Sequence, residues 1–316
     1  MRNWLLASAL LLLPALAVAA DAPPEWAYPA IPPGFQAPPE EAQAKHVAGS
    51  TKAYTPKEIS DAFGPPDWFP GEHPPMPNIV AHGKKPEVSG CALCHLSSGH
   101  GHPESANLAG LPAAYIEEQL GEFRNGNRQS LLAGRSANMI RFAKGMSDED
   151  IKQAAQYFSA IKRTAWNKIV ETNEVPKTYV GEGNMRFASA GNAKEPIARR
   201  IIEVPTDEEG AHLRDPHSPF MAYVPTGSLK AGEALATTGG NGKTIQCSVC
   251  HGADFKGIGN VPGIAGRSPI YIFRQLNDIQ KGMRKGNAVA LMVPVVAKLS
   301  QDDMIALAAF MASRTP

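Results

Sequence analysis

The sequence contains little cysteine, almost no excess of charge and few long apolar runs. Its 316 residues include four cysteines, and 31 lysines and arginines nearly balance 30 aspartates and glutamates. Nucleic-acid-binding proteins need a basic excess to neutralise phosphates, so this balance argues against that class of function. Charged residues make up only 19% of the chain and hydrophobic residues 43%, so the chain is unlike a charged disordered polymer and can build packed cores.

One apolar run is long, and it lies at the N-terminus. Arg2 precedes a Leu- and Ala-rich stretch over residues 5–16, and small residues follow as far as Ala19. This pattern predicts a secretory signal peptide over residues 1–20, cleaved on one side or the other of Ala20. The run is short for a bilayer span and no later run is long enough, so we expect a periplasmic protein without a stable membrane span. An uncleaved membrane anchor is the alternative.

The four cysteines occur as two copies of the pattern C-x-x-C-H. The six motif residues are Cys91, Cys94 and His95 in the first copy, and Cys247, Cys250 and His251 in the second. Two thiols at this spacing can add to the two vinyl groups on one edge of a porphyrin, and the adjacent histidine can then bind the iron. The sequence therefore predicts two covalently attached haem c groups. Disulfides, which an exported protein permits, and structural zinc are the alternatives.

The chain also contains an internal duplication. A shift of 156 positions places His95 on His251. The same shift aligns Gly110, Tyr115, Ile116, Gln119, Leu120, Gly126 and Arg128 with Gly266, Tyr271, Ile272, Gln275, Leu276, Gly282 and Arg284. After Arg128 the first copy carries three extra residues, and the shift becomes 153. Because this period is far longer than the roughly 20–50 residues of solenoid repeats, we interpret the copies as two domains.

Each copy has the pattern of helices separated by loops. Pro112 suits the first position of a helix over residues 113–123, and Ser268 is a candidate N-cap for the matching helix. Ser147 and Ser300 each precede a first turn rich in carboxylates, which is typical of a helix N-terminus. Neither copy shows a convincing alternating strand pattern. We therefore expect an all-α fold class, with each domain built around a haem.

The rest of the chain lies before and between the copies. We divide the sequence into the signal peptide 1–20, a Pro-rich N-terminal extension 21–75, a first domain 76–163, an inter-domain segment 164–226 and a second domain 227–316. The inter-domain segment has too many apolar residues for a tether, so we expect it to lie irregularly against the domains, with a short strand or two. The extension is expected to wrap the surface. Both segments are candidates for a haem cover or docking surface, and plain loop packing is the alternative.

In a haem that only carries electrons, the sixth coordination position of the iron is usually occupied by a second protein ligand, often methionine in exported proteins. Under the shift of 153, Met139 falls on Met292, so these two are the shared candidates. Met146 falls on Leu299, which is typical of a packing position, yet it stays an alternative ligand for the first haem.

Other side chains are weaker candidates for the sixth ligand. His100 and His102 follow the first motif in a Gly-rich loop, where we expect exposed histidines rather than ligands. Met283 falls opposite Asn127, so it is not shared between the copies. Arg199 and the arginine after it are interpreted as a solvated pair.

These residues together resemble the cytochrome c4 family, exported dihaem proteins made of two class I cytochrome c domains. The resemblance covers about residues 88–162 and 229–313, from C-x-x-C-H through Tyr-Ile-x-x-Gln-Leu to the Ser-x-x-Asp helix start. It implies His95 with Met139, and His251 with Met292, as the axial pairs, and it implies a two-fold relation between the domains. In such domains a proline carbonyl often accepts the proximal histidine N–H. Pro262 fits that role, whereas the first copy has Ala106 there.

The leading hypothesis is an electron carrier rather than an enzyme. It would move single electrons from a dehydrogenase or quinol-oxidising complex to an oxidase or another acceptor, and it needs no catalytic acid, base or nucleophile. A dihaem peroxidase or a thiosulfate-dehydrogenase-type enzyme is the second hypothesis. It needs an open iron site or a cysteine ligand, and all four cysteines are used for attachment. A cytochrome subunit of a larger dehydrogenase is the third.

Overall fold

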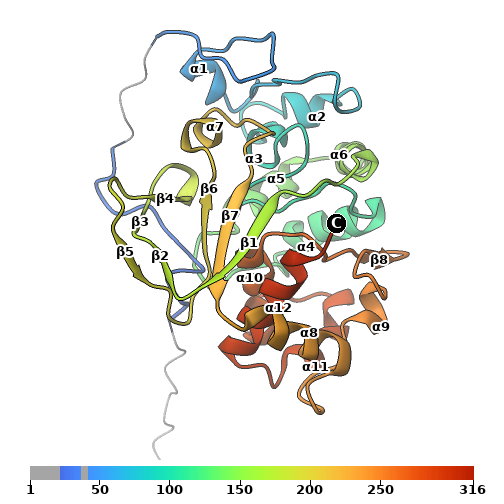
Figure 1. Ribbon diagram of the computed structural model, residues 1–316. Helices are drawn as coiled ribbons and strands as arrows, with labels where there is room; N and C mark the ends of the chain where they lie inside the picture. The colour runs from blue at the N-terminus through green and yellow to red at the C-terminus, as the bar shows by residue number, and fades with distance from the viewer. Residues whose placement is uncertain (1–21, 37–41) are drawn as a thin grey trace, which may run out of the picture.

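Two helical domains lie one above the other, and a sheet-containing segment flanks both of them (Figure 1). The structure is a computed structural model that describes residues 22–36 and 42–316. The predicted signal peptide lies outside the described residues. Within those two ranges, no helix is both long enough and apolar enough to cross a bilayer.

The first domain is built from five helices. They are α2 (Asn78–Ala81), α3 (Ala92–His95), α4 (Ala113–Arg124), α5 (Ala137–Gly145) and α6 (Asp148–Ala160). Ser147 caps α6 as predicted: its hydroxyl accepts from the Asp150 N–H, and the Asp150 carboxylate accepts from the Ser147 N–H in return. The apolar stripe of α6, including Ile151 and Phe158, is buried in the core of this domain.

The second domain repeats this arrangement. Its elements are α8 (Ser228–Thr238), α9 (Ser248–His251), β8 (Gly257–Ile258), β9 (Val261–Pro262), α10 (Pro269–Gln280), the 3-10 helix η2 (Ala288–Leu291), α11 (Val293–Val296) and α12 (Gln301–Ser313). Ser268 caps α10 and Ser300 caps α12, which confirms both predicted helix starts. α12 is apolar on nearly every side and packs against α8 and α10 at the centre of the domain.

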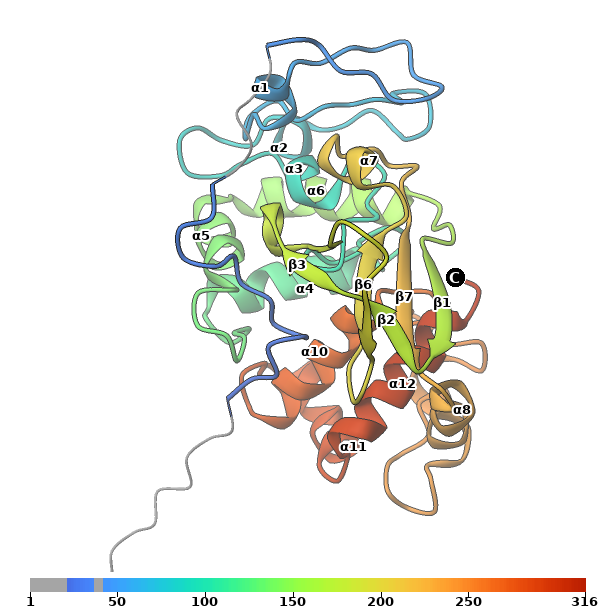
Figure 2. The same ribbon diagram turned by 60° about the vertical axis from the view of Figure 1, so that its left-hand side comes forward.

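The inter-domain segment corrects the all-α prediction, because strands form most of it. Its elements are β1 (Asn167–Thr172), β2 (Glu174–Pro176), β3 (Thr178–Val180), the 3-10 helix η1 (Glu182–Asn184), β4 (Arg186–Ala188), β5 (Lys194–Pro196), β6 (Ile202–Pro205), α7 (Glu208–His212) and β7 (Phe220–Pro225). β1, β7 and β6 form one sheet, in which β7 runs parallel to β1 and antiparallel to β6 (Figure 2). β2 pairs with β5 and β3 with β4. The segment is therefore an ordered unit rather than an irregular loop.

This segment packs against both domains. Ile201 and Val224 belong to the core of the second domain, while Trp166 and Phe220 pack with Leu96 of the first. Arg199 is exposed and pairs with Asp302 at 2.6 Å. The segment therefore fixes the two domains to each other through buried apolar contacts.

The N-terminal extension also contacts both domains. Trp26 and Tyr28 are buried in the core of the second domain, where Trp26 packs on Phe273 with the ring centroids 4.5 Å apart. Further along, the short helix α1 (Pro56–Ile59) and Trp68 lie over the first domain, and the Trp68 indole N–H donates to the Leu213 carbonyl. The extension and the inter-domain segment thus meet beside the first domain.

Candidate haem sites

Each C-x-x-C-H motif forms a short helix that presents its histidine to the domain core. His95 ends α3 and His251 ends α9, and both are buried. The Nδ1 atom of His95 lies 2.8 Å from the Ala106 carbonyl oxygen, and that of His251 lies 2.8 Å from the Pro262 carbonyl oxygen. The carbonyl oxygen accepts a hydrogen bond from the Nδ1–H group. The Nε2 lone pair of each ring is therefore free to bind a metal. Alanine in the first copy leaves this bond intact.

Burial keeps both imidazoles in the form that binds iron. It lowers the pKa of His95 and the pKa of His251, because a buried imidazolium loses its hydration. Both rings are therefore neutral at neutral pH. Among the described residues no disulfide joins the four motif cysteines, so their sulfur atoms stay available for attachment to a haem. In the described part of the chain, no group of three or more His, Cys, Asp or Glu side chains could hold a metal ion.

The predicted methionines lie in the same two cores as the motifs. Met139 is on α5 and packs against the first core, as Cys91 does. Met292 lies between η2 and α11 and packs against the second core, as Cys247 does. Both are only partly buried. Met146 is instead a member of the first core, as its counterpart Leu299 is of the second. Met146 therefore occupies a packing position in the structure.

His100 corrects the expectation of an exposed loop histidine. Its ring is buried, stacks on Trp166 at 4.5 Å, and is hydrogen-bonded to the hydroxyls of Ser98 and Thr164. Burial lowers the pKa of His100 to about 4. His102 is half-buried and lies 3.2 Å from the hydroxyl of Ser105.

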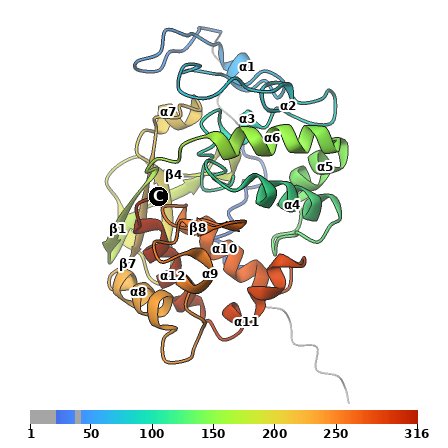
Figure 3. The same ribbon diagram turned by 90° about the vertical axis from the view of Figure 1, so that its right-hand side faces the viewer.

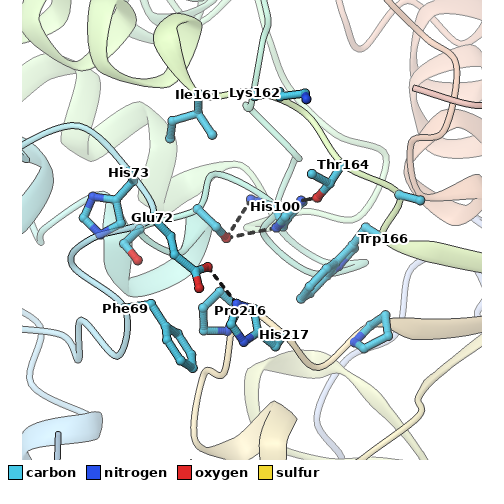
Figure 4. A pocket seen from close by; sticks show the side chains of 14 residues that line it. Phe69, Glu72, His73, His100, Ile161, Lys162, Thr164, Trp166, Pro216 and His217 are labelled. Atoms are coloured by element: carbon cyan, nitrogen blue, oxygen red, sulfur yellow. Dashed lines mark hydrogen bonds and ion pairs between the residues drawn. The ribbon is translucent and has the colours of Figure 1, made fainter. Parts of the chain in front are cut away.

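A cavity of about 370 Å³ lies against the Gly-rich loop that follows the first motif. It lies where the extension, the first domain and the inter-domain segment meet, and it is lined by residues of all three (Figure 4). Glu72 of the extension pairs with His217 of the inter-domain segment at 2.7 Å across it. The Gly-rich loop of the first motif therefore faces protein rather than solvent, which the sequence of the loop alone did not indicate.

The residues around the two motifs fit a group that carries carboxylates. In the described part of the chain, six buried side-chain nitrogen atoms have no hydrogen-bond partner, and three of them are Nδ2 of Asn107, Nη2 of Arg267 and Nε of Arg284. Asn107 directly follows the carbonyl that anchors His95, and the Asn107 carbonyl accepts from Nη1 of Arg267. Because buried donors are rarely left unpaired, these atoms match the propionates of a haem.

Sequence reasoning missed a polar cluster where the domains meet, beside α4 and α10 (Figure 3). Arg128 donates to Gln119 of its own domain and to Tyr271 and Gln275 of the other. Arg284 makes the same set with the domains exchanged, to Gln275, Tyr115 and Gln119. The signal was present in the duplication, because all six residues were aligned as identical pairs. Their mutual contact required the domain arrangement.

Comparison with known proteins identifies the family to which these two sites belong. The family model of cytochrome c matches residues 80–162 and, separately, residues 229–315. The chain belongs to the cytochrome c family. Each match contains one C-x-x-C-H motif, one anchored histidine and one of the paired methionines. The protein is thus a c4-like dihaem cytochrome with two covalently attached haem c groups, and it transfers electrons.

The chain is also similar to several named proteins. A thiosulfate dehydrogenase electron acceptor from Thiomonas intermedia is 27% identical over 72% of this chain and 80% of its own length. Cytochrome c4 from Pseudomonas aeruginosa is 36% identical over 27% of this chain and 39% of its own length. A solved thiosulfate dehydrogenase from Marichromatium purpuratum, 28% identical, aligns with a TM-score of 0.48 over 72% of this chain and 37% of its own length.

Proposed function

We propose that this cytochrome is a periplasmic electron carrier that accepts electrons from a thiosulfate-oxidising dehydrogenase and passes them to a further acceptor. The observation that carries the proposal is the pair of equivalent sites, each with an anchored histidine and a matched methionine in one core. The donor class is supported by the relative from Thiomonas intermedia, which is named for that role.

In this proposal His95 and Met139 are the axial ligands of the first haem, and His251 and Met292 those of the second. Each bound haem supplies a one-electron iron couple. The main-chain carbonyls of Ala106 and Pro262 orient the histidines, and thioether ligation favours the reduced state. The apolar cores exclude water from the two sites. Electron transfer also does not need a substrate atom to reach the iron.

The test is reduction of the purified protein by thiosulfate with and without a catalytic amount of a thiosulfate dehydrogenase. We expect two electrons per protein, delivered only when the dehydrogenase is present, because a carrier accepts electrons from the dehydrogenase and not from thiosulfate itself. Reduction by thiosulfate alone would support the enzyme hypothesis instead. No reduction in either mixture would exclude this class of donor, while reduction by dithionite would still report a competent carrier.

The subunit hypothesis differs only in how long the partner stays bound. A carrier is expected to purify alone and to exchange freely between donor molecules. Co-purification of the native protein with a dehydrogenase in a fixed ratio would favour a permanent complex.

A further inference from the structure

The loop that leads to Met139 is longer than its counterpart in the second domain. The three extra residues of the first copy lie between Arg128 and Met139, because the shift changes from 156 to 153 between these two aligned positions. We call residues 129–136 the insertion loop. It ends where α5 begins, and Met139 is the third residue of α5. The position of the insertion loop therefore helps to set where the Met139 thioether can lie.

The insertion loop is anchored on the second domain. The Leu131 N–H donates to Oδ1 of Asp278 on α10 at 3.1 Å, and the Gln129 N–H donates to the Met283 carbonyl at 2.9 Å. The side chains of Leu131 and Leu132 pack against the core of the second domain. In Figure 2 the green loop below α5 reaches toward α10 and the blue N-terminal extension. A segment of the first domain that precedes its candidate iron ligand is thus held by the other domain.

The same carboxylate also binds the N-terminal extension. Asp278 is only 4% exposed, and its Oδ1 accepts from the Tyr28 hydroxyl at 2.8 Å. At the far end of the insertion loop, Nη1 of Arg135 donates to the Pro29 carbonyl at 2.9 Å. Burial raises the pKa of Asp278, and the hydrogen bonds from Leu131 and Tyr28 oppose that rise. One buried carboxylate therefore joins α10, the extension and the insertion loop.

The first domain has a carboxylate at the equivalent position. The shift of 156 places Glu122 on Asp278, and Glu122 lies against the loop that leads to Met292. A Cβ atom on Gly286 of that loop would come within 2.6 Å of the Glu122 carboxylate carbon. Oε2 of Glu122 is nevertheless buried without a hydrogen-bond partner among the described residues. The two domains thus present aligned carboxylates to each other's methionine loops, and Asp278 is the one that binds its loop.

We propose that Asp278 is a positioning residue for Met139, so that methionine ligation at the first haem depends on the second domain and the extension. Anchoring the insertion loop removes conformational freedom before the thioether binds, so ligation costs less entropy. Met292 has no such anchor. The two sites, alike in their ligands, therefore differ in what holds the methionine in place. This inference rests on the proposed axial pairs.

The experiment measures how easily imidazole replaces methionine in the ferric holoprotein. The imidazole nitrogen takes the place of the thioether sulfur, the iron stays ferric, and the far-red band of methionine-bound haem is lost. Asp278→Ala removes both accepted hydrogen bonds, and Glu122→Ala is the matched control at the aligned position. Asp278→Asn keeps an accepting oxygen, and Tyr28→Phe removes one of the two bonds.

We expect one haem of Asp278→Ala to bind imidazole about tenfold more tightly or more, because hydrogen bonds to a charged group that held the loop are lost. The other haem, and both haems of Glu122→Ala, should keep the affinity of the unaltered protein. Asp278→Asn should restore most of the loss. Tyr28→Phe should shift the same haem by a smaller factor, so the test does not depend on one variant. In a Met139→Ala background, Asp278→Ala should have no further effect.

Three outcomes would overturn the inference. They are an equal effect of Asp278→Ala on both haems, an equal effect of Glu122→Ala, and unchanged imidazole affinity in both Asp278→Ala and Tyr28→Phe. A different result would contradict the proposed ligands themselves. In that case the unaltered protein would lack the far-red band, or would keep it while imidazole binds.

Discussion

Glu203, in the inter-domain segment, is a carboxylate whose pKa is strongly shifted by its surroundings. It lies on β6, is almost fully buried, and accepts hydrogen bonds from the Ser268 hydroxyl and the Ile270 N–H at the start of α10. These bonds, and the positive end of the helix, favour the ionised form. Burial outweighs them and raises the pKa of Glu203 to about 7. The link between β6 and α10 therefore depends on pH near neutrality.

The substitution Glu203→Gln tests this dependence. Because the folded protein holds the proton more tightly than the unfolded chain, Glu203 makes the free energy of unfolding fall as pH rises from about 4.5 to about 7. Glutamine keeps the accepting oxygen and cannot ionise. We expect the variant to equal the unaltered protein near pH 4.5 and to be more stable by up to about 3 kcal/mol above pH 7, measured by urea unfolding. Exposed Glu117→Gln is the control, and an identical pH profile for both variants would contradict the account.

At the scale of elements, the attachment of the N-terminal extension also changes with pH. His73 is hydrogen-bonded to Asp67 at 2.9 Å, and its ring lies edge-on to Tyr157 of α6. The hydrogen bond to Asp67 raises the pKa of His73, although partial burial opposes it. A raised pKa means that the stabilising contribution is fully present below the ordinary histidine pKa and is lost as pH rises through the folded value.

We therefore expect the extension to loosen in mildly alkaline solution. Hydrogen exchange of residues 67–73, corrected for the intrinsic rate, should become less protected as the pH rises above the ordinary pKa of histidine. In the variant His73→Gln this pH dependence should disappear, whereas protection of α12 should not change in either protein. A persistent slope in His73→Gln would assign the loosening to another group.

The elements that the sequence predicted well are those determined by local signals. Ser147 and Ser300 mark helix starts because each side chain bonds a main-chain N–H three residues away. The sheet of the inter-domain segment has no such signal. β1 pairs with β7, about fifty residues later, and its burial pattern does not alternate cleanly. Its stability comes from packing against both domains, which the segment's own sequence does not specify.

Across the whole molecule, the two domains are joined by a nearly symmetric set of hydrogen bonds. Arg128 and Arg284 are both buried, and each guanidinium donates to a tyrosine and a glutamine of the opposite domain. Their main chains also form an antiparallel bridge. The interface therefore fixes how the two haem sites face each other.

The substitution Arg128→Ala should weaken this interface. It removes three hydrogen bonds and leaves the Tyr271 hydroxyl without one of its partners, so we expect a loss of about 3 kcal/mol in the free energy of unfolding of the holoprotein. Arg128→Ala/Arg284→Ala should lose less than the sum of the single changes, because both arginines donate to the same glutamines. Exposed Arg141→Ala is the matched control. Strict additivity would show that the two arginines act independently.

At this scale, the sequence predicted candidate site residues but not their environment. Spacing identified Cys91, Cys94, Cys247 and Cys250, and the duplication paired Met139 with Met292, because both signals are local or repeated. The burial of His100 depends on Thr164 and Trp166, which come from a segment far from it in the chain. Contacts of that kind arise only from the fold, so the covered loop after the first motif could not be foreseen.

The central claim is that histidine and methionine are the two protein ligands of each haem iron. With both positions occupied, the protein is an electron carrier. The most direct measurement is the weak far-red absorption band of ferric haem bound to methionine sulfur, quantified per protein. We predict two equivalents in the unaltered protein and one in the variant Met292→Ala. One equivalent or none in the unaltered protein would mean an open or differently ligated iron, and it would contradict the account.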